Sequence, residues 1–414
     1  MTFIDLYKKL AGAAVAGDPA SAAREAAALG ADPHHLDCLL NPEAHAPVWR
    51  QGDCTCAPED AHCLNACLFN AVTRDEKGNV TIDAKKCVGC EECLRRCKEK
   101  KLTESRDILP AMAAVRAGGA PVYALIAPAF VSQFNTAVTP GRLRAAFKRL
   151  GFAGMVEVAV FADILTLKEA LEFDRNVVKE TDFHLTSCCC PVWIAMLRKL
   201  YRTLMPHVPA AVSPMIACAR TVKKLHPEAK TVFVGPCIAK KAEAREPDLA
   251  GDVDFVLTFT EMRDIFDFAR IDPAQMPEDE RDHSSRAGRI YARAGGVSEA
   301  VCDTVRRLSP DRAIDVRPRC ADGVAACKAM IDALVKGETT ENFFEGMGCA
   351  GGCVGGPKAL IDREAGRRNV NEYGDASPYR TPVDNPYVVE LLGRLGFETV
   401  ESLLDDSDIF TRKF

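Results

Sequence analysis

The sequence predicts an α/β protein with parallel strands, preceded by a small module that is rich in cysteine. From about residue 120, short apolar runs alternate with helical stretches, which is the pattern of parallel α/β layers. Between about residues 35 and 105, cysteines and charges are dense and long apolar runs are few. A length of 414 residues is enough for two or three domains. The chain is therefore expected to fold as a cluster-stabilised module followed by a large α/β core.

The first 30 residues predict two short helices that form a helical lead-in. The second has Asp18 as its N-cap, Pro19 at the first helical position and Gly30 past its end. The tail from about residue 365 to 414 is polar and then helical, which predicts a C-terminal cap.

Five apolar runs predict the buried strands of the α/β core. Each cysteine motif of this region follows a run or lies in a turn, where ligands of an open α/β sheet gather. The runs that precede Pro191 and Pro236 suggest two similar halves that face one another. The five runs are residues 122–128, 155–161, 183–186, 231–234 and 255–259.

Composition argues against several classes of protein. The formal net charge is −5 and no long basic stripe occurs, so we expect no nucleic-acid partner. The densest positive patch, residues 95–101, is either a solvated helix end or a docking place for an acidic redox partner. The longest apolar run, residues 117–131, is too short to span a membrane and contains two prolines. Nineteen cysteines without a secretory signal favour a reducing cytoplasm, where thiols stay free to hold metal.

The strongest local motif is a ferredoxin-like run of four cysteines at residues 87–97. Three thiolates at this spacing wrap three corners of a cubane, and the fourth points to a neighbouring cluster. The partner run has a less regular spacing, and Cys38 is a possible substitute ligand there, although a lone buried thiol is the alternative. Zinc held by four cysteines is the competing interpretation. The two expected 4Fe-4S ligand sets are Cys67, Cys87, Cys90 and Cys93, and Cys54, Cys56, Cys63 and Cys97.

Three distant segments carry a second group of cysteines in turns rich in glycine and proline. They are residues 186–193 with Cys190, residues 235–241 with Cys237, and residues 347–357 with Cys349 and Cys353. Together they could supply four thiolates to one buried cluster, and small glycines let the backbone approach a bulky inorganic ligand. An ordinary pair on a buried helix is the other interpretation of Cys349 and Cys353. Cys218, Cys302, Cys320 and Cys327 lack partners at ligand spacing and are expected to be buried.

From about residue 35 to 360 the chain resembles an iron-only (FeFe) hydrogenase, since these segments are similar to the three signatures of that family. The resemblance implies an α/β two-lobed hydrogenase-like catalytic domain with an N-terminal ferredoxin-like α+β dicluster domain. It implies domains at residues 1–34, 35–108, 109–365 and 366–414, for the lead-in, the dicluster domain, the catalytic domain and the cap.

The resemblance also implies the cofactor and its ligands. Cys190, Cys237, Cys349 and Cys353 would hold a third 4Fe-4S cluster, and Cys353 would bridge to a diiron subsite with carbonyl, cyanide and azadithiolate ligands. Lys240 would donate a hydrogen bond to one cyanide. Ala127, Pro128 and Met347 would line the subsite.

Proton delivery is implied in the same way. Cys189, just before the cluster ligand, matches the relay cysteine of the family, and the triple cysteine makes Cys188 a rival. Glu169 and Glu172, three residues apart on a predicted helix, match the relay glutamates, although a solvated helix face is the common alternative.

The expected function is reversible H2 oxidation and proton reduction, with an electron carrier such as ferredoxin as partner and maturation proteins to supply the diiron subsite. Gly235 and Met215 depart from the family pattern and resemble its sensory branch, so a hydrogen or redox sensor is the alternative. A second alternative is an iron–sulfur assembly protein that holds cubanes only.

Overall fold

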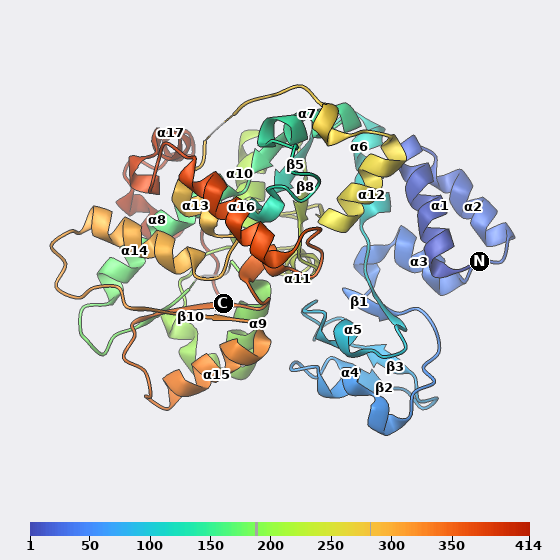
Figure 1. Ribbon diagram of the computed structural model, residues 1–414, viewed down its shortest axis with the longest axis horizontal. Coiled ribbons are helices and arrows are strands. Elements are labelled where there is room, and N and C mark those ends of the chain that lie inside the picture. Colours follow the sequence, from blue (N-terminus) through green and yellow to red (C-terminus); the bar gives the residue numbers. More distant parts are fainter. Residues whose placement is uncertain (187–188, 282) are drawn as a thin grey trace.

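The computed structural model describes residues 1–186, 189–281 and 283–414. Three helices open the chain: α1 (Phe3–Ala16), α2 (Pro19–Ala28) and α3 (Pro33–Leu40). Each begins at a capping side chain, and Asp18 accepts a hydrogen bond from the Ser21 N–H with Pro19 at the first position, as predicted. Helix α1 packs on the large domain, so the lead-in contacts more than the module that follows it (Figure 1).

The cysteine-rich module is small and mostly irregular. It consists of two antiparallel strand pairs and two short helices: β1 (Val48–Arg50) with β4 (Leu102–Glu104), β2 (Val72–Arg74) with β3 (Val80–Ile82), α4 (His62–Asn65) and α5 (Glu92–Arg96). Its core contains six of the cysteine side chains among valine and leucine, and such a small apolar core needs additional cross-links.

The first lobe of the large domain is a four-stranded parallel sheet in the order β6-β5-β8-β9. Its strands are nearly continuous apolar runs because helices cover both faces. The strands are β5 (Val122–Ile126), β6 (Gly154–Glu157), β8 (Lys230–Gly235) and β9 (Phe255–Thr258), and the helices are α6 (Ile108–Ala117), α7 (Pro140–Leu150), α10 (Pro214–Leu225), α11 (Ala239–Ala244) and α12 (Phe259–Ala269).

The second lobe is a three-stranded parallel sheet in the order β10-β11-β7. Two lobes with parallel sheets agree with the predicted fold class. The strands are β7 (His184–Leu185), β10 (Pro318–Asp322) and β11 (Phe343–Met347), and the helices are α8 (Ala159–Asn176), α9 (Pro191–Leu200), α13 (Arg286–Ile290), α14 (Gly296–Leu308) and α15 (Val324–Val335).

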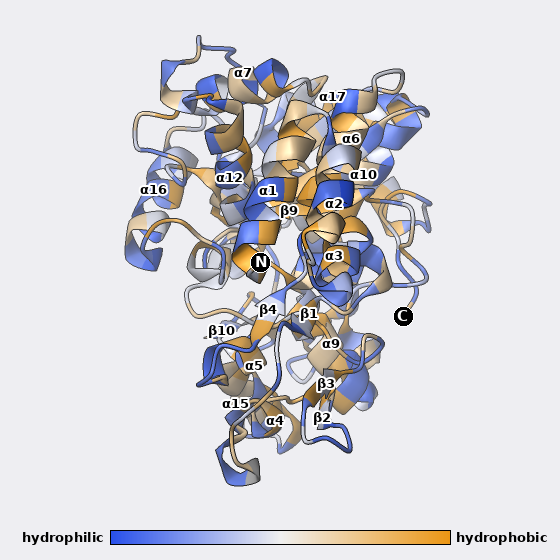
Figure 2. Cartoon of the chain, turned by 90° about the vertical axis from the view of Figure 1, so that its right-hand side faces the viewer, coloured by the Kyte–Doolittle hydropathy of each residue, from blue (hydrophilic) through white to orange (hydrophobic). Residues whose placement is uncertain are grey.

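The C-terminal segment crosses the outside of the two lobes. Helix α16 (Arg363–Asp375) is largely hydrophilic in Figure 2, and α17 (Pro386–Arg394) follows it. No helix in the described part of the chain is long and apolar enough to cross a membrane. The 3-10 turns are η1 (Pro42–Ala44), η2 (Pro58–Asp60), η3 (Pro128–Phe130), η4 (Arg202–His207), η5 (Pro273–Gln275), η6 (Gly352–Gly355), η7 (Pro382–Asp384) and η8 (Glu401–Leu404).

Two predictions about the elements were wrong. The run at residues 155–161 is a strand only as far as Glu157, and Ala159 begins the buried helix α8. Strands β10 and β11 were not predicted at all.

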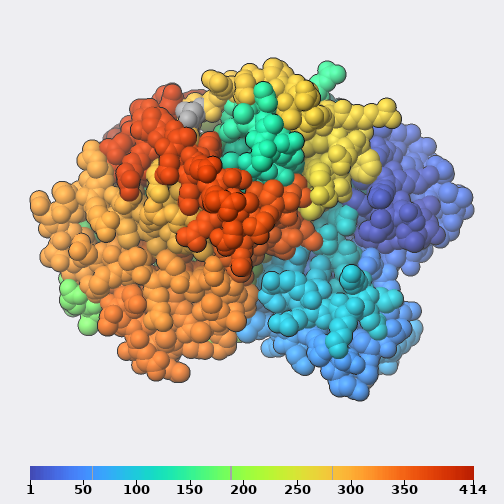
Figure 3. All heavy atoms as spheres, in the orientation of Figure 1, coloured from blue at the N-terminus to red at the C-terminus, as the bar shows by residue number. Residues whose placement is uncertain are grey.

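A groove separates the module from the second lobe, lined by Asn65 and Arg95 on one side and Val324 on the other, and Figure 3 shows a hollow there.

Candidate metal centres

The three cysteine segments of the large domain lie at the carboxyl ends of parallel strands. Cys190 follows β7 and is the N-cap of α9, while Cys237 follows β8. Cys349 follows β11, and Cys353 lies within η6. Because carboxyl ends of parallel strands meet at one edge of a sheet, the two lobes present these thiols toward one another.

The four thiols are half-buried side chains that form one group inside the protein, as their mutual electrostatic effects show. Burial, together with the smaller effect of the neighbouring Cys190 and Cys353 thiolates, raises the pKa of Cys237 to about 12. Burial and then Cys190 raise the pKa of Cys353 to about 11. For Cys349, burial and then Cys237, Cys190 and Cys353 raise the pKa well above its usual value. Cys237, Cys349 and Cys353 therefore resist ionisation beside Cys190, and a metal cluster would stabilise this ligand set by replacing the protons.

Backbone contacts hold the first and third segments together. The Gly348 N–H donates a hydrogen bond to the Cys190 Sγ at 3.2 Å. A Cβ at Gly348 would lie 2.6 Å from the Val192 Cβ, so only glycine allows this approach. The donor set and its packing therefore fit a buried inorganic group bound by four thiolates.

The residues expected to line the diiron subsite lie around this group. Met347 is buried and shares an apolar cluster with Cys189 and Cys353. Ala127 is buried at the end of β5, beside the second segment, since a Cβ at Gly235 would lie 3.1 Å from the Ala127 Cβ. Pro128 begins η3 directly after it.

Lys240 is a buried cation beside two of the thiols. Its Nζ lies 2.7 Å from Glu243 Oε2. Burial lowers the pKa of Lys240, but Glu243, Cys237 and Cys353 outweigh this effect and hold the pKa above its usual value. Glu243 was not among the predicted site residues, and the signal for it was a carboxylate three residues after a lysine on the same short helix.

The module brings together both predicted sets of four cysteines. Cys67, Cys87, Cys90 and Cys93 line one small cavity, together with Val48 and Val88. Cys54, Cys56, Cys63 and Cys97 line a second cavity, together with His62 and Arg96. Cys38 lines neither cavity and lies on α3 beside His34 and His45.

Apolar packing connects the three cysteine groups in a row. One apolar cluster of the module contains side chains of both cubane sets, such as Cys63 and Cys93. A second cluster joins Cys67 and Cys90 of the module to Cys190 and Cys237 of the large domain. The set around Cys87 therefore lies between the set around Cys54 and the buried group of the two lobes.

The two glutamates of the predicted relay are buried on α8, so the alternative of a solvated helix face was wrong. Glu169 is 1% exposed and Glu172 is 5% exposed. Glu169 Oε1 lies 3.8 Å from His184 Nε2, and Glu172 Oε1 lies 3.1 Å from Lys168 Nζ. The pKa of the Cys189 thiol is raised, first by burial and then by the charges of Cys190, Glu345 and Glu169. Glu169 is therefore close to Cys189. Cys188 lies outside the described residues.

Glu345 is a buried carboxylate that the sequence analysis did not identify. It lies in β11 and accepts hydrogen bonds from the N–H groups of Gly295 and Ser298, at 2.8 and 2.7 Å. The signal for it was an acidic residue within a short apolar run just before Met347.

Two of the remaining cysteines differ in burial: Cys218 is fully buried as predicted, but Cys320 is exposed because β10 is an edge strand.

Comparison with known proteins gives one family. Residues 120–357 match the family model described as iron only hydrogenase large subunit, C-terminal domain. The chain is 31% identical over 261 residues to the periplasmic Fe hydrogenase large subunit of Nitratidesulfovibrio vulgaris, which covers 53% of this chain and 62% of that protein. It is 27% identical over 365 residues to an NADP-reducing hydrogenase subunit of Solidesulfovibrio fructosivorans, covering 74% of this chain and 62% of that protein. The chain thus spans less than two thirds of the length of either relative.

Solved structures show the same fold. An apo FeFe-hydrogenase variant from Chlamydomonas reinhardtii superimposes with a TM-score of 0.60 at 23% identity, covering 75% of this chain and 98% of that one. The chain is also 28% identical to the human nuclear prelamin A recognition factor over 319 residues, 64% of this chain and 70% of that protein.

Proposed function

Because the chain belongs to the iron-only hydrogenase family, we propose that it interconverts H2 with protons and electrons at a buried six-iron centre. The observation that carries the proposal is the single buried group formed by Cys190, Cys237, Cys349 and Cys353 between the two lobes. Free thiols would keep this ligand set intact in a reducing cytoplasm, which is the proposed location.

The ligand assignment follows the three groups of thiols. Each would hold one 4Fe-4S cluster, and Cys353 would also bridge to the diiron subsite with its carbonyl, cyanide and azadithiolate ligands. When bound, this centre supplies the redox chemistry by which H2 is split or formed. Lys240 would hold a cyanide with its charged Nζ, which Glu243 orients at 2.7 Å. Met347, Ala127 and Pro128 would exclude water from the subsite.

Protons would travel along α8. The Cys189 Sγ would exchange a proton with the centre, and the Glu169 carboxylate is the next buried acid on that side. Glu172, three residues further along α8, would carry the proton outward, with its carboxylate held by the Lys168 Nζ. Both acids are shielded from bulk water, so a proton on them passes along a defined direction.

Electrons would leave through the two cubanes of the module. The set around Cys87 packs against the buried group, and the set around Cys54 lies beyond it. Arg96, Lys98 and Lys101 line the outer cavity together with Asp60 and Glu99, and this small excess of positive charge suits an acidic electron carrier such as ferredoxin. Maturation proteins would supply the diiron subsite.

The test is infrared spectroscopy and H2 turnover of the full chain after maturation with the diiron subsite. Carbonyl and cyanide bands together with rapid turnover are the expected result. Bands that respond reversibly to H2 with only slow turnover would favour a hydrogen sensor, which the departures at Gly235 and Met215 suggest. Iron–sulfur signals without any carbonyl or cyanide bands would overturn the proposal and favour an assembly protein that holds cubanes only.

A further inference from the structure

Three side chains with metal-binding atoms meet where the helical lead-in joins the module, away from both cubane cavities. His34 and Cys38 lie one turn apart on α3, and His45 follows η1. One ligand atom of each residue lies within 4.8 Å of the other two, and Cys38 Sγ lies 3.7 Å from His34 Nε2. We propose that His34, Cys38 and His45 form a binding site for a single zinc ion.

The observed spacing is close to that of a tetrahedral zinc site. Bonds of about 2.3 Å to sulfur and about 2.0 Å to nitrogen place these two ligand atoms about 3.6 Å apart. Cys38 Sγ lies 3.7 Å from His34 Nε2, within about 0.2 Å of this value, and 3.8 Å from Nδ1, so the imidazole must turn to direct one nitrogen at the ion. The third donor needs only a side-chain adjustment, because His45 follows the short turn η1 and is half-buried.

His45 has the supporting contact that is typical of a metal-ligating imidazole. Its Nε2 lies 2.8 Å from Asp37 Oδ2, and the Asn41 Nδ2 donates a hydrogen bond to Asp37 Oδ1 at 2.7 Å. A carboxylate that accepts a hydrogen bond from one ring nitrogen fixes the tautomer, so that the other nitrogen presents its lone pair to a metal. The geometry therefore points to His45 Nδ1 as the donor.

The protonation states suit metal binding. Burial and the neighbouring His45 and His35 lower the pKa of His34, so its imidazole is neutral and able to bind. Burial raises the pKa of Cys38 to about 12, so the thiol keeps its proton in the metal-free protein. Binding of Zn²⁺ would replace that proton, which passes to solvent, and the Cys38 Sγ would bind as thiolate.

The donor set selects the kind of metal. Two imidazole nitrogens and one thiolate suit a borderline ion such as Zn²⁺ and do not suit Mg²⁺ or Ca²⁺, which prefer oxygen. His34 is exposed, so water can take the fourth position. Trp49 of β1 packs edge-on against His34, so the site lies where α3 meets the first strand of the module.

The experiment uses the full chain with its iron–sulfur clusters reconstituted and Zn²⁺ added alone. Zinc X-ray absorption and a metal count are specific for zinc even beside iron. The expected result is one zinc per chain, with one sulfur at about 2.3 Å and nitrogen or oxygen at about 2.0 Å. His34→Ala should abolish this zinc, and Asp37→Asn should weaken its binding about 10- to 100-fold. The matched control is His226→Ala, which removes an exposed histidine elsewhere and should change nothing.

Three results would overturn the proposal. One is the absence of bound zinc at equimolar metal. Another is zinc that His34→Ala and His226→Ala retain equally. The third is a zinc spectrum with only sulfur neighbours, which would place the ion in the cubane cysteines. His34→Ala is the decisive variant because His34 is exposed, whereas a change at buried Cys38 alters the core as well.

Discussion

The backbone of Gly89 lies directly against that of Ala239. A Cβ at Gly89 would stand 3.0 Å from the Ala239 Cα and 3.0 Å from the Ile238 oxygen. Gly89 lies between Cys87 and Cys90 of the inner cubane set, and Ala239 is two residues beyond Cys237. This contact therefore sets how closely the module approaches the buried thiol group of the large domain.

Gly89→Ala should both weaken the fold and slow electron flow between the two sites. Gly89 has a φ of +69°, which costs an L-residue about 1–2 kcal/mol, and the forced separation should add about 1–3 kcal/mol. The control is Gly30→Ala, since Gly30 lies just past the end of α2 with a φ of +74° and has no atom within 4 Å of an added Cβ. Urea unfolding and dye-linked H2 oxidation would measure both effects. Equal losses in the two variants would show that the Gly89 contact does not matter.

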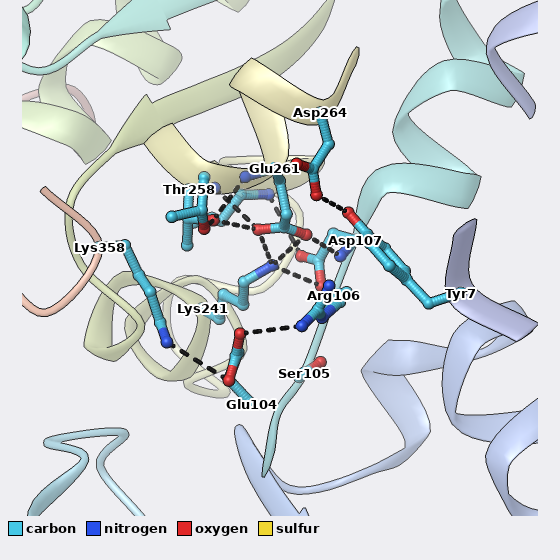
Figure 4. Close-up of polar contacts among 12 residues, drawn as sticks. Tyr7, Glu104, Ser105, Arg106, Asp107, Lys241, Thr258, Glu261, Asp264 and Lys358 are labelled. Atoms are coloured by element: carbon cyan, nitrogen blue, oxygen red, sulfur yellow. Dashed lines mark hydrogen bonds and ion pairs between the residues drawn. The ribbon is translucent and has the colours of Figure 1, made fainter. Parts of the chain in front are cut away.

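Lys241 is a fully buried cation that holds the junction of the module and the large domain. Its Nζ lies 3.1 Å from Asp107 Oδ1 and 3.1 Å from Glu261 Oε2, and the Asp107 N–H donates a hydrogen bond to Glu261 Oε1 at 2.7 Å (Figure 4). Lys241→Met would remove the cation that pairs with the buried Glu261 carboxylate and would leave Asp107 paired with Arg245, at 3.2 Å. We expect the free energy of unfolding to fall by about 3–5 kcal/mol, measured by urea denaturation.

The control for Lys241 is Lys328→Met. Lys328 pairs with Asp332 at 2.7 Å on the exposed surface of α15, so its loss should cost less than about 1 kcal/mol. The variant that also carries Glu261→Gln should recover part of the lost stability, because the carboxylate that Lys241 paired is then neutral while Asp107 keeps Arg245. Absence of any recovery would contradict the electrostatic explanation.

The sequence predicted those parts of the structure that local patterns determine. Cysteine spacing alone assigned all eight cysteines of the module to the two cavities that they line. Continuous apolar runs predicted β5, β8 and β9, because a parallel sheet covered on both faces is uniformly apolar.

The errors arose where tertiary contacts decide the outcome. Residues 159–161 are apolar in either conformation, and they belong to the helix α8, which is buried on nearly every side. Strand β10 is a partly exposed edge strand with no apolar run. Strand β11 contains Glu345, whose burial is possible only because distant N–H groups at Gly295 and Ser298 bind it.

His184 should make the protein less stable as the pH falls. Burial, and then His207, lower the pKa of His184 to about 3, and the ring packs against Phe173 and Phe343. The unfolded chain, with an ordinary histidine pKa of about 6.5, therefore binds a proton that the folded chain refuses. The contribution of the neutral His184 ring to the free energy of unfolding is fully present above about pH 6.5. Below that pH it falls by up to about 1.4 kcal/mol per pH unit.

His184→Gln tests this dependence by urea unfolding at about pH 7 and about pH 5.5. The variant should lose stability less steeply on acidification than the native chain, and His226→Gln, at an exposed position, should leave the slope unchanged. Glu169 Oε1, 3.8 Å from His184 Nε2, is the one nearby acid that could stabilise the charged ring among the ion pairs of the described residues. An unchanged slope in His184→Gln would mean that Glu169 lets His184 titrate normally.

Cys189→Ala should remove most H2 turnover while the clusters still assemble. The Cys189 thiol lies beside Cys190, Glu345 and Glu169, and it is the group in the proposed relay nearest to the buried cluster site. Loss of a positioned proton donor costs about 10²- to 10⁴-fold in rate. Infrared bands of the matured variant would check assembly, and Cys302→Ala, which changes a buried cysteine on α14, is the control for loss of a thiol from the core. Turnover retained in Cys189→Ala, with intact bands, would assign the proton transfer to Cys188 or to another group, because the alanine side chain cannot carry a proton.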